Sequence, residues 1–422
     1  MTELLNFFRD KKVLILGFGL EGKSTLKLIQ DLPCEIAAAD KNPDVLAGLP
    51  YLLYEGERYL DSLHDGSVDI IMKSPGISFK GLDIPDYIRH KVTSQTDLLL
   101  RFRQNKIVGI TGTKGKSTVS SLIHHILKHC GKDTALIGNI GVPPLENNYP
   151  PETILVCEMS CHQLEYVQSS PDIAVFLNLY EEHLDHYDSY ADYRAAKENI
   201  YLYQKPGDML FYNDELVSLK LLSSKGGKTA FNYAGIIKRP PVKTHLPGKH
   251  NQYNIAVAVA VCTHLGCDES KAVEAVGSFT GLPHRLEHAG FINGVEYVND
   301  SISTIPAAVI SAHEAFPDTD TLIIGGMDRG INYDELIAFL PKCGIINVIA
   351  LPESGHKIAE DLLTSPLKIY CARDMEDAVS RAVRVTRRRC ILSPAAASYN
   401  VYKNFEERGN HFKEMLKCYS KT

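Results

Sequence analysis

Short apolar runs rich in β-branched residues alternate with helix-like stretches along the whole chain. This alternation is typical of parallel sheets whose faces are covered by helices. The sequence therefore predicts an α/β fold of three domains: a Rossmann-like domain at 1–93, a central P-loop domain at 94–284 and a second Rossmann-like domain at 285–422. Strands are expected at 13–16, 34–39, 68–72, 107–110, 154–157, 173–177, 321–324, 347–351, 368–371 and 390–392, and the clearest helices at 117–130 and 252–265.

Composition excludes several classes of protein. Of the 422 residues, 44% are hydrophobic and 23% are charged, so the chain can bury several cores and is not globally disordered. A net charge of -6 argues against a protein that binds nucleic acid through its phosphates. No apolar window approaches the ~18–20 residues of a membrane span, and the charged N-terminal residues are unlike a signal peptide. We expect a soluble, cytoplasmic, monomeric enzyme.

The ten cysteines are scattered, without a CxxC motif or a repeated spacing. Cys157 and Cys161, with His162 beside the second, come nearest to a metal cluster. Because no second pair of ligands has zinc spacing, these side chains are expected to pack in a core or to line a site.

Two glycine-rich loops, each between a predicted strand and a predicted helix, compete for a nucleotide. The first, GFGLEG at 17–22, has the dinucleotide-binding pattern, with Asp40 about 20 residues on, where a ribose-binding acid would lie. Together with Lys23 and Ser24 it also satisfies the strict phosphate-loop pattern. The second, GITGTKGKST at 109–118, fails that pattern because Ile110 stands where the first glycine should be.

Chemistry favours the second loop for ATP. A triphosphate needs backbone N–H groups, a lysine and a hydroxyl that binds Mg²⁺. Lys116 and Ser117 begin a predicted helix, whose free amides and dipole would face the phosphates. Glu158 and the acids and imidazoles at 181–186 follow as candidate Mg²⁺ ligands. The first loop is then a pyrophosphate turn, and Lys23 is a surface residue of the helix.

Three segments together resemble the Mur ligases. Residues 109–118 are similar to the ATP loop of that family, 178–187 to its asparagine-to-histidine motif, and 392–398 with 403–409 to a C-terminal signature. The resemblance implies a ligase that joins glutamate to UDP-N-acetylmuramoyl-L-alanine in peptidoglycan precursor synthesis. A substrate carboxylate would attack the γ-phosphate of ATP, and the glutamate amine would displace phosphate from the acyl phosphate. The protein would mainly position groups and neutralise charge.

The resemblance also assigns residues to ATP and to the metal. For ATP it implies Gly112, Thr113, Lys114, Gly115, Lys116, Ser117, Thr118, Asn251, Asn254, Arg285 and Asp300. For Mg²⁺ it implies Ser117, Glu158, His183 and Lys197, the last as a carbamate whose negative charge would stabilise the metal site. Lys116, His183 and Lys197 are the expected catalytic side chains.

The outer two domains would bind the other substrates. For the UDP substrate the resemblance implies Gly17, Gly19, Gly22, Asp40, Ser74 and Asn139, and for glutamate Arg329, Ser398 and Phe405. One position departs from the family pattern, because Ile302 replaces a lysine beside the glutamate site and leaves Arg329 as the evident cation. Family frequency favours D-glutamate, whereas the Ile302 segment resembles a branch that adds L-glutamate, so both enantiomers stay open.

Two other classes of protein compete with the ligase. A nicotinamide-dependent dehydrogenase would use the first loop and Asp40 but would leave the second loop and Glu158 without a purpose. A catalytically inactive nucleotide-binding protein would keep the fold, but it would not need so complete a set of ligands.

Overall fold

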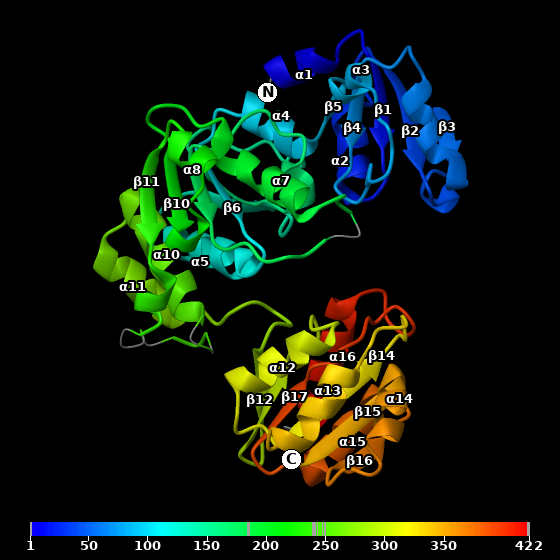
Figure 1. Cartoon of the computed structure of the whole chain (residues 1–422), viewed down its shortest axis with the longest axis vertical. Helices are drawn as coiled ribbons and strands as arrows, with labels where there is room; N and C mark the ends of the chain where they lie inside the picture. Colours follow the sequence, from blue (N-terminus) through cyan, green and yellow to red (C-terminus); the bar gives the residue numbers. More distant parts are fainter. Residues whose placement is uncertain are drawn as a thin grey trace. The chain divides into compact units, whose positions relative to one another are not determined.

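The computed structural model describes residues 2–183, 186–238, 242, 244–246, 248 and 250–419. Asp185, an acid of the predicted ligand cluster, lies outside the described residues. The chain divides into two compact units: unit 1 is Met1–Val242 with Gln252–Gly277, and unit 2 is Lys243–Asn251 with Ser278–Thr422. Three sheets of five, six and six strands confirm the predicted α/β class (Figure 1). Over the described ranges, no helix is long and apolar enough to cross a membrane.

The first sheet of unit 1 is parallel throughout, in the order β3-β2-β1-β4-β5. Its elements are α1 (Thr2–Phe8), β1 (Lys12–Leu16), α2 (Leu20–Ile29), β2 (Glu35–Asp40), η1 (Pro43–Val45), β3 (Leu52–Glu55), η2 (Gly56–His64), β4 (Ile70–Lys73), α3 (Asp86–Arg89), β5 (Val92–Thr93) and α4 (Gln95–Phe102). The central strand β1 is apolar and almost wholly buried, as expected when helices cover both faces. The strand order reverses between β1 and β4, so a ligand crevice is expected beyond the carboxyl ends of these two strands.

The second sheet of unit 1 is also parallel throughout, in the order β11-β10-β9-β6-β8-β7. Its elements are β6 (Ile107–Thr111), α5 (Lys116–His129), β7 (Thr134–Gly138), β8 (Ile154–Glu158), α6 (Cys161–Leu164), β9 (Ile173–Phe176), α7 (Tyr190–Leu202), β10 (Met209–Asn213), η3 (Asp214–Leu216), α8 (Leu219–Ser223), β11 (Gly227–Phe231), α9 (Tyr233–Ile236), α10 (His250–His264) and α11 (Glu269–Ser278). One apolar cluster contains Ile15, Met72, Leu155 and Phe176 and so joins the two sheets. Because β8 and β9 flank β6, the segments that follow these three strands meet at one edge.

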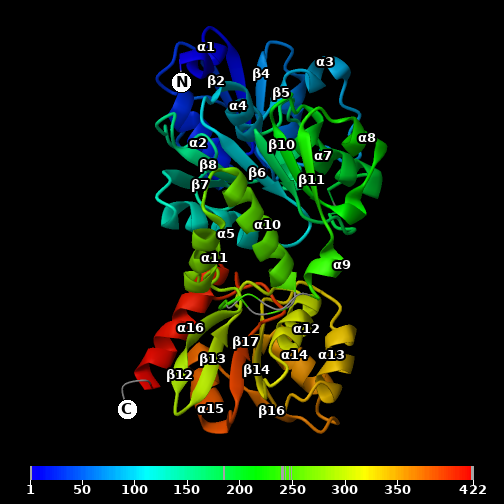
Figure 2. The same cartoon turned by 90° about the vertical axis from the view of Figure 1, so that its left-hand side faces the viewer.

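Unit 2 holds the third sheet, in the order β12-β13-β17-β14-β15-β16, with only the β12–β13 pair antiparallel (Figure 2). Its elements are β12 (Glu287–Ile292), β13 (Val295–Asn299), α12 (Pro306–Ala315), β14 (Thr321–Gly326), α13 (Asp334–Phe339), η4 (Leu340–Lys342), β15 (Asn347–Glu353), α14 (Ser354–Asp361), β16 (Lys368–Cys371), α15 (Met375–Val385), β17 (Arg389–Leu392) and α16 (Phe405–Tyr419). Side chains of α15 and α16 pack on one face of this sheet, and those of α12, α13 and α14 pack on the other.

Candidate active site

The loop between β6 and α5 is shaped to bring backbone to a ligand. Gly112 and Gly115 have φ of +155° and +86°, and a Cβ at Gly115 would lie 2.9 Å from Asn254 Oδ1 on α10. The Lys116 ammonium folds back over the loop and donates to the carbonyl oxygens of Gly112 (2.9 Å) and Thr113 (3.0 Å). Ser117 and the buried Thr118 complete the first turn of α5, where free amides can receive an anion.

This loop is clamped to the segment that follows β9. The Asn178 side chain accepts from Lys114 N (2.8 Å) and donates to Lys114 O (3.0 Å). The Lys114 ammonium pairs with Glu182 at 2.8 Å. The Thr113 hydroxyl hydrogen-bonds to that of Tyr193 on α7 at 2.9 Å. The start of the asparagine-to-histidine motif is therefore adjacent to the loop.

Lys197 on α7 also contacts this loop. It is only 1% exposed, and its ammonium donates to the carbonyl oxygen of Gly112 at 2.9 Å. Gly112 O therefore accepts from Lys116 and Lys197 together. Burial, and then repulsion by Lys116, lowers the pKa of Lys197 to about 7. Burial also lowers the pKa of Lys116, against the attraction of Glu158.

Glu158, the last residue of β8, is 1% exposed. Its Oε1 accepts from Asn139 Nδ2 at 2.8 Å. Its Oε2 is buried, and no hydrogen-bond donor reaches it from the described part of the chain. A buried carboxylate oxygen without a donor is costly, and a divalent cation would satisfy it. The carboxylate of Glu158 therefore suits Mg²⁺. Ser117 at the start of α5 offers a hydroxyl as a second oxygen ligand.

His183 follows in the segment after β9, with φ of +61°, a left-handed conformation that is uncommon for residues other than glycine. Its Nε2 lies 3.7 Å from the Glu182 carboxylate. Its ring centroid lies 4.8 Å from that of His162 on α6. Backbone strain of this kind is found at functional sites more often than elsewhere.

The first glycine loop, between β1 and α2, is held by two side chains. Gly17 has φ of +91°, and a Cβ at Gly22 would lie 2.2 Å from Gly17 O, so a side chain there would break the turn. Asp40 accepts from Phe18 N at 2.6 Å, and Ser74 donates to Gly17 O at 2.6 Å. Gly19 caps α2 from its N-terminal side. Lys23 is exposed on α2, so it does not fold over its loop as Lys116 does.

The structure adds polar residues that the sequence did not reveal. The Lys73 ammonium at the end of β4 is buried and pairs with Glu165 at 3.0 Å, and Glu165 also lies 3.4 Å from His186. Glu21, inside the first loop, accepts from Gln163 at 2.7 Å, and burial raises its pKa to about 7. These contacts link the two sheets of unit 1. One sign of these contacts is visible in the sequence, a lysine at the end of an otherwise apolar strand.

Asn139, a predicted residue of the UDP site, contacts Glu158. Its side chain contacts Glu158, and its backbone N–H donates to Glu158 O at 2.9 Å. Both the side chain and the backbone of Asn139 therefore hold the residue against Glu158. The two adenine candidates on α10 fall in different units: Asn254 lies against Gly115 in unit 1, whereas Asn251 is counted with unit 2.

In unit 2, Asp300 fixes the segment that carries Arg285. Asp300 is 2% exposed and accepts from Leu286 N, Ser303 Oγ and Ser393 Oγ at 3.1, 2.5 and 2.8 Å. Burial raises the pKa of Asp300 to about 6. His284 and Leu286 have φ of +62° and +45°, and Arg285 between them is exposed. Asp300 therefore acts on the Arg285 turn through the backbone.

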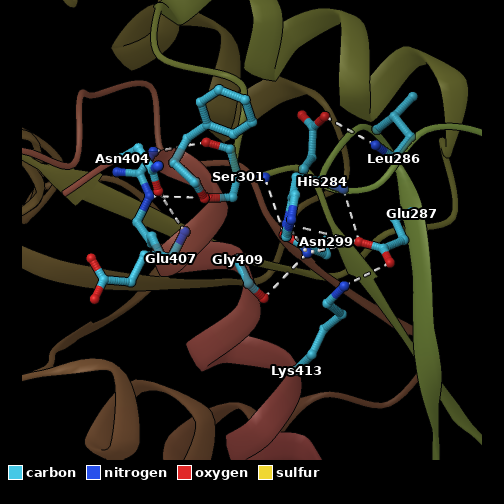
Figure 3. A network of polar contacts seen from close by, with 12 residues as sticks. His284, Leu286, Glu287, Asn299, Ser301, Asn404, Glu407, Gly409 and Lys413 are labelled. Carbon is cyan, nitrogen blue, oxygen red and sulfur yellow. Dashed lines mark hydrogen bonds and ion pairs between the residues drawn. The ribbon is translucent and has the colours of Figure 1, made fainter. Parts of the chain in front are cut away.

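Phe405, one of the predicted glutamate residues, begins α16, which a polar network at Ser301 joins to the turn after β13 (Figure 3). The Ser301 hydroxyl donates to Phe405 O at 2.8 Å. The buried Arg408 guanidinium donates to Ser301 O at 2.8 Å and to the carbonyl oxygens of Ala396 and Ala397 at 3.0 and 3.2 Å. This holds the buried Ser398 and the start of α16 against the turn after β13.

The remaining glutamate candidates flank this network. Ile302 is partly buried, and its backbone N–H donates to His284 O at 3.1 Å. Arg329 is exposed in the loop after β14, two residues from Met327, whose N–H donates to Ala397 O at 2.9 Å. Asn299 supports the same turn, since its amide donates to Glu287 at 3.0 Å and to Gly409 O at 3.3 Å.

Known proteins resemble the chain in sequence and in fold. Residues 110–262 match the family model for the Mur ligase middle domain. The UDP-N-acetylmuramoylalanine–D-glutamate ligase of Aquifex aeolicus is 33% identical over 430 residues, covering 97% of this chain and 99% of the relative. The enzyme of the same name from Symbiobacterium thermophilum is 31% identical over 454 residues, with the same two coverages of 97% and 99%.

Solved structures agree with this fold. UDP-N-acetylmuramate–alanine ligase MurC of Thermotoga maritima has a TM-score of 0.59 at 18% identity, over 97% of this chain and 99% of that one. The MurF ligase of Thermotoga maritima, solved in complex with ADP, has a TM-score of 0.59 at 18% identity, over 99% and 100% of the two chains. At these identities the likeness extends to the architecture alone.

Proposed function

The chain belongs to the Mur ligase family, and we propose that it joins D-glutamate to UDP-N-acetylmuramoyl-L-alanine at the expense of ATP. The observation that carries the proposal is the carbonyl of Gly112, on which two ammoniums, those of half-buried Lys116 and buried Lys197, converge at 2.9 Å each. Such a concentration of positive charge needs an anion, and the γ-phosphate of ATP is the anion that this loop geometry suits. The names of the relatives favour D-glutamate.

The reaction has two steps. The substrate carboxylate attacks the γ-phosphorus, so that a C–O–P bond forms and ADP leaves. The neutral amine of glutamate then attacks the acyl carbon, an amide bond forms, and phosphate leaves with the amine proton passing to solvent or base. Lys116 would neutralise charge on the transferring phosphoryl group, and the loop amides would orient it.

Mg²⁺ would be held by Glu158, Ser117, His183 and a carbamate on Lys197, and it would neutralise charge between the phosphates. The buried Oε2 of Glu158 supports this assignment. The lowered pKa of Lys197, about 7, supports the carbamate, because a neutral amine is the form that attacks CO₂. An N–C bond forms, a proton is released, and repulsion between the Lys197 and Lys116 ammoniums becomes attraction.

The first loop would bind the UDP moiety through Gly17, Gly19 and Gly22, with Asp40 and Ser74 fixing its shape. Asn139 would act with Glu158. Asn251, Asn254, Arg285 and Asp300 would complete the ATP site. The domains would run 1–93 for UDP, 94–284 for ATP and 285–422 for the amino acid. A cytoplasmic monomer fits substrates that are soluble nucleotides.

Glutamate carries two carboxylates, and Arg329 with Ser398 and Phe405 offers one evident cation. Arg408 would supply a second positive charge beside Ser398, since its guanidinium donates to the carbonyl oxygens of Ala396 and Ala397. Its pKa falls to about 10 because of burial, which leaves it charged at neutral pH. This charge would take over part of the work of the lysine that Ile302 replaces.

The decisive experiment measures phosphate release and amide product with UDP-N-acetylmuramoyl-L-alanine and each glutamate enantiomer. We expect kcat/KM for D-glutamate to exceed that for L-glutamate by more than about tenfold, or ~1.4 kcal/mol. Ile302→Lys should improve D-glutamate by less than about tenfold, because Arg408 already supplies charge. A preference for L-glutamate would reject the proposed substrate. If Ile302→Lys raised kcat/KM for D-glutamate by ~30-fold or more, the role of Arg408 would be rejected. That factor is the low end of the cost of leaving a buried charge without its partner.

A further inference from the structure

Three side chains of types that can bind a metal come together in unit 1 from two segments of the chain. Cys161 and His162 are the first two residues of α6, and His183 lies in the segment after β9. The Cys161 sulfur and one ring nitrogen from each histidine all lie within 4.8 Å of one another. Sequence spacing shows only the adjacent Cys161–His162 pair, and the fold brings in the third side chain.

The environment of this Cys161–His162–His183 cluster suits a ligand. Cys161 is 2% exposed, and the Nε2 of His162 is buried with no hydrogen-bond partner in the described part of the chain. A buried ring nitrogen without a partner carries a desolvation penalty that a bound cation would remove. The His183 side chain is 39% exposed, so an ion can reach the cluster from solvent.

Neighbouring rings hold His162 without using that nitrogen. The His162 ring lies 4.0 Å from the ring of His186 and stacks at 5.8 Å on that of Tyr187. His186 is itself engaged by Glu165 at 3.4 Å, so it stands outside the cluster. Packing therefore sets the orientation of the His162 ring, and a metal-binding histidine needs such a fixed orientation.

A thiolate with two imidazoles is a soft donor set. Zn²⁺ accepts three such protein ligands and keeps a fourth position for water, whereas Mg²⁺ prefers oxygen ligands. We propose that Cys161, His162 and His183 form a Zn²⁺ site, and that Zn²⁺ bound there withdraws His183 from Mg²⁺ and inhibits the ligase. The site stands on its own geometry, and only its inhibitory effect rests on the proposed function.

Binding is tested on the full-length protein after treatment with EDTA, with Zn²⁺ alone competed against a chromophoric chelator. We expect one Zn²⁺ per chain, with affinity reduced at least ~10–100-fold in Cys161→Ser and in His162→Phe, a range that even outer-shell substitutions reach. Cys418→Ser, at an exposed cysteine, is the matched control and should bind as wild type does. Co²⁺ alone should give a thiolate-to-cobalt charge-transfer band that Cys161→Ser lacks. Melting temperatures without metal show that both variants are folded.

Activity separates the two parts of the proposal. At saturating Mg²⁺, Zn²⁺ should inhibit wild type at concentrations at least tenfold lower than His162→Phe, each compared with its own rate without Zn²⁺. Unchanged Zn²⁺ affinity in Cys161→Ser, or an absent cobalt band in wild type, would overturn the site. Zn²⁺ binding at these residues without inhibition would overturn the competition for His183. A chain that binds Zn²⁺ as expected but forms no amide would contradict the proposed function and leave the site standing.

Discussion

The two glycine-rich loops of unit 1 each make a tight turn between a strand and a helix, yet different ionisable groups contact them. In the first, the largely buried ionisable group is the Glu21 carboxyl, and the pattern lysine, Lys23, is exposed. In the second, two ammoniums meet at the Gly112 carbonyl. A triphosphate needs compensating cations, whereas a diphosphate can be held by backbone amides. On the proposed assignment, the direction and burial of the lysine distinguish the two ligands, and a residue pattern records neither.

The largest effect is expected from removing the second loop's lysine. Lys116→Ala should lower the rate of ADP formation by ~10²–10³, or ~3–4 kcal/mol, because the transferring phosphoryl group loses a preorganised positive charge. Lys23→Ala is the matched control, since it removes the equivalent lysine of the first loop. It should leave ATP turnover within about twofold of wild type and affect at most the KM of the UDP substrate. Greater damage to ATP turnover from Lys23→Ala would reverse the assignment of the two loops.

A smaller effect is expected from Lys197 on α7, whose ammonium also contacts the Gly112 carbonyl. Lys197→Ala should lower activity ~10–100-fold, in the range of lost metal-site support, and acetate or another short-chain acid should restore part of it. A free carboxylate can occupy the space of the carbamate, whereas it cannot restore Lys116→Ala, which serves as the control. The measurement is initial rate against acid concentration. Full activity of Lys197→Ala without any acid would remove the carbamate from the site.

The sequence predicted the parts of the fold that depend on local pattern. The strands expected at 107–110 and 321–324 correspond to β6 and β14, because central parallel strands are buried on both faces and consist of continuous apolar residues. The edge strand β11, exposed in part, and the two-residue β5 carry no such pattern and were not anticipated.

The residues of the site also differ in whether local pattern could predict their contacts. Lys114 and Asn178 come together because the segments that follow neighbouring strands of one parallel sheet share an edge. The pairing of Lys73 with Glu165 joins residues 92 positions apart, and the meeting of Cys161 with His183 also depends on tertiary packing. Spacing along the chain cannot encode such contacts. The contact of the Asn139 side chain with Glu158 is of the same kind.

The smallest effect concerns the acid of the first loop. Burial raises the pKa of Glu21 from 4.5 to about 7, so between these values the folded state holds a proton that the unfolded state has lost. Stability should therefore fall as pH rises through this window and level off above it. Glu21→Gln keeps an oxygen to accept from Gln163 and removes the titration. Its melting temperature should match that of wild type at pH 4.5 and exceed it by a few degrees at pH 8, for at most about 2–3 kcal/mol. Glu3→Gln, at an exposed glutamate of α1, is the control and should show no gap at either pH. An equal gap at both pH values would mean that Glu21 is ionised throughout, and the first loop would then differ from the second only in the direction of its lysine.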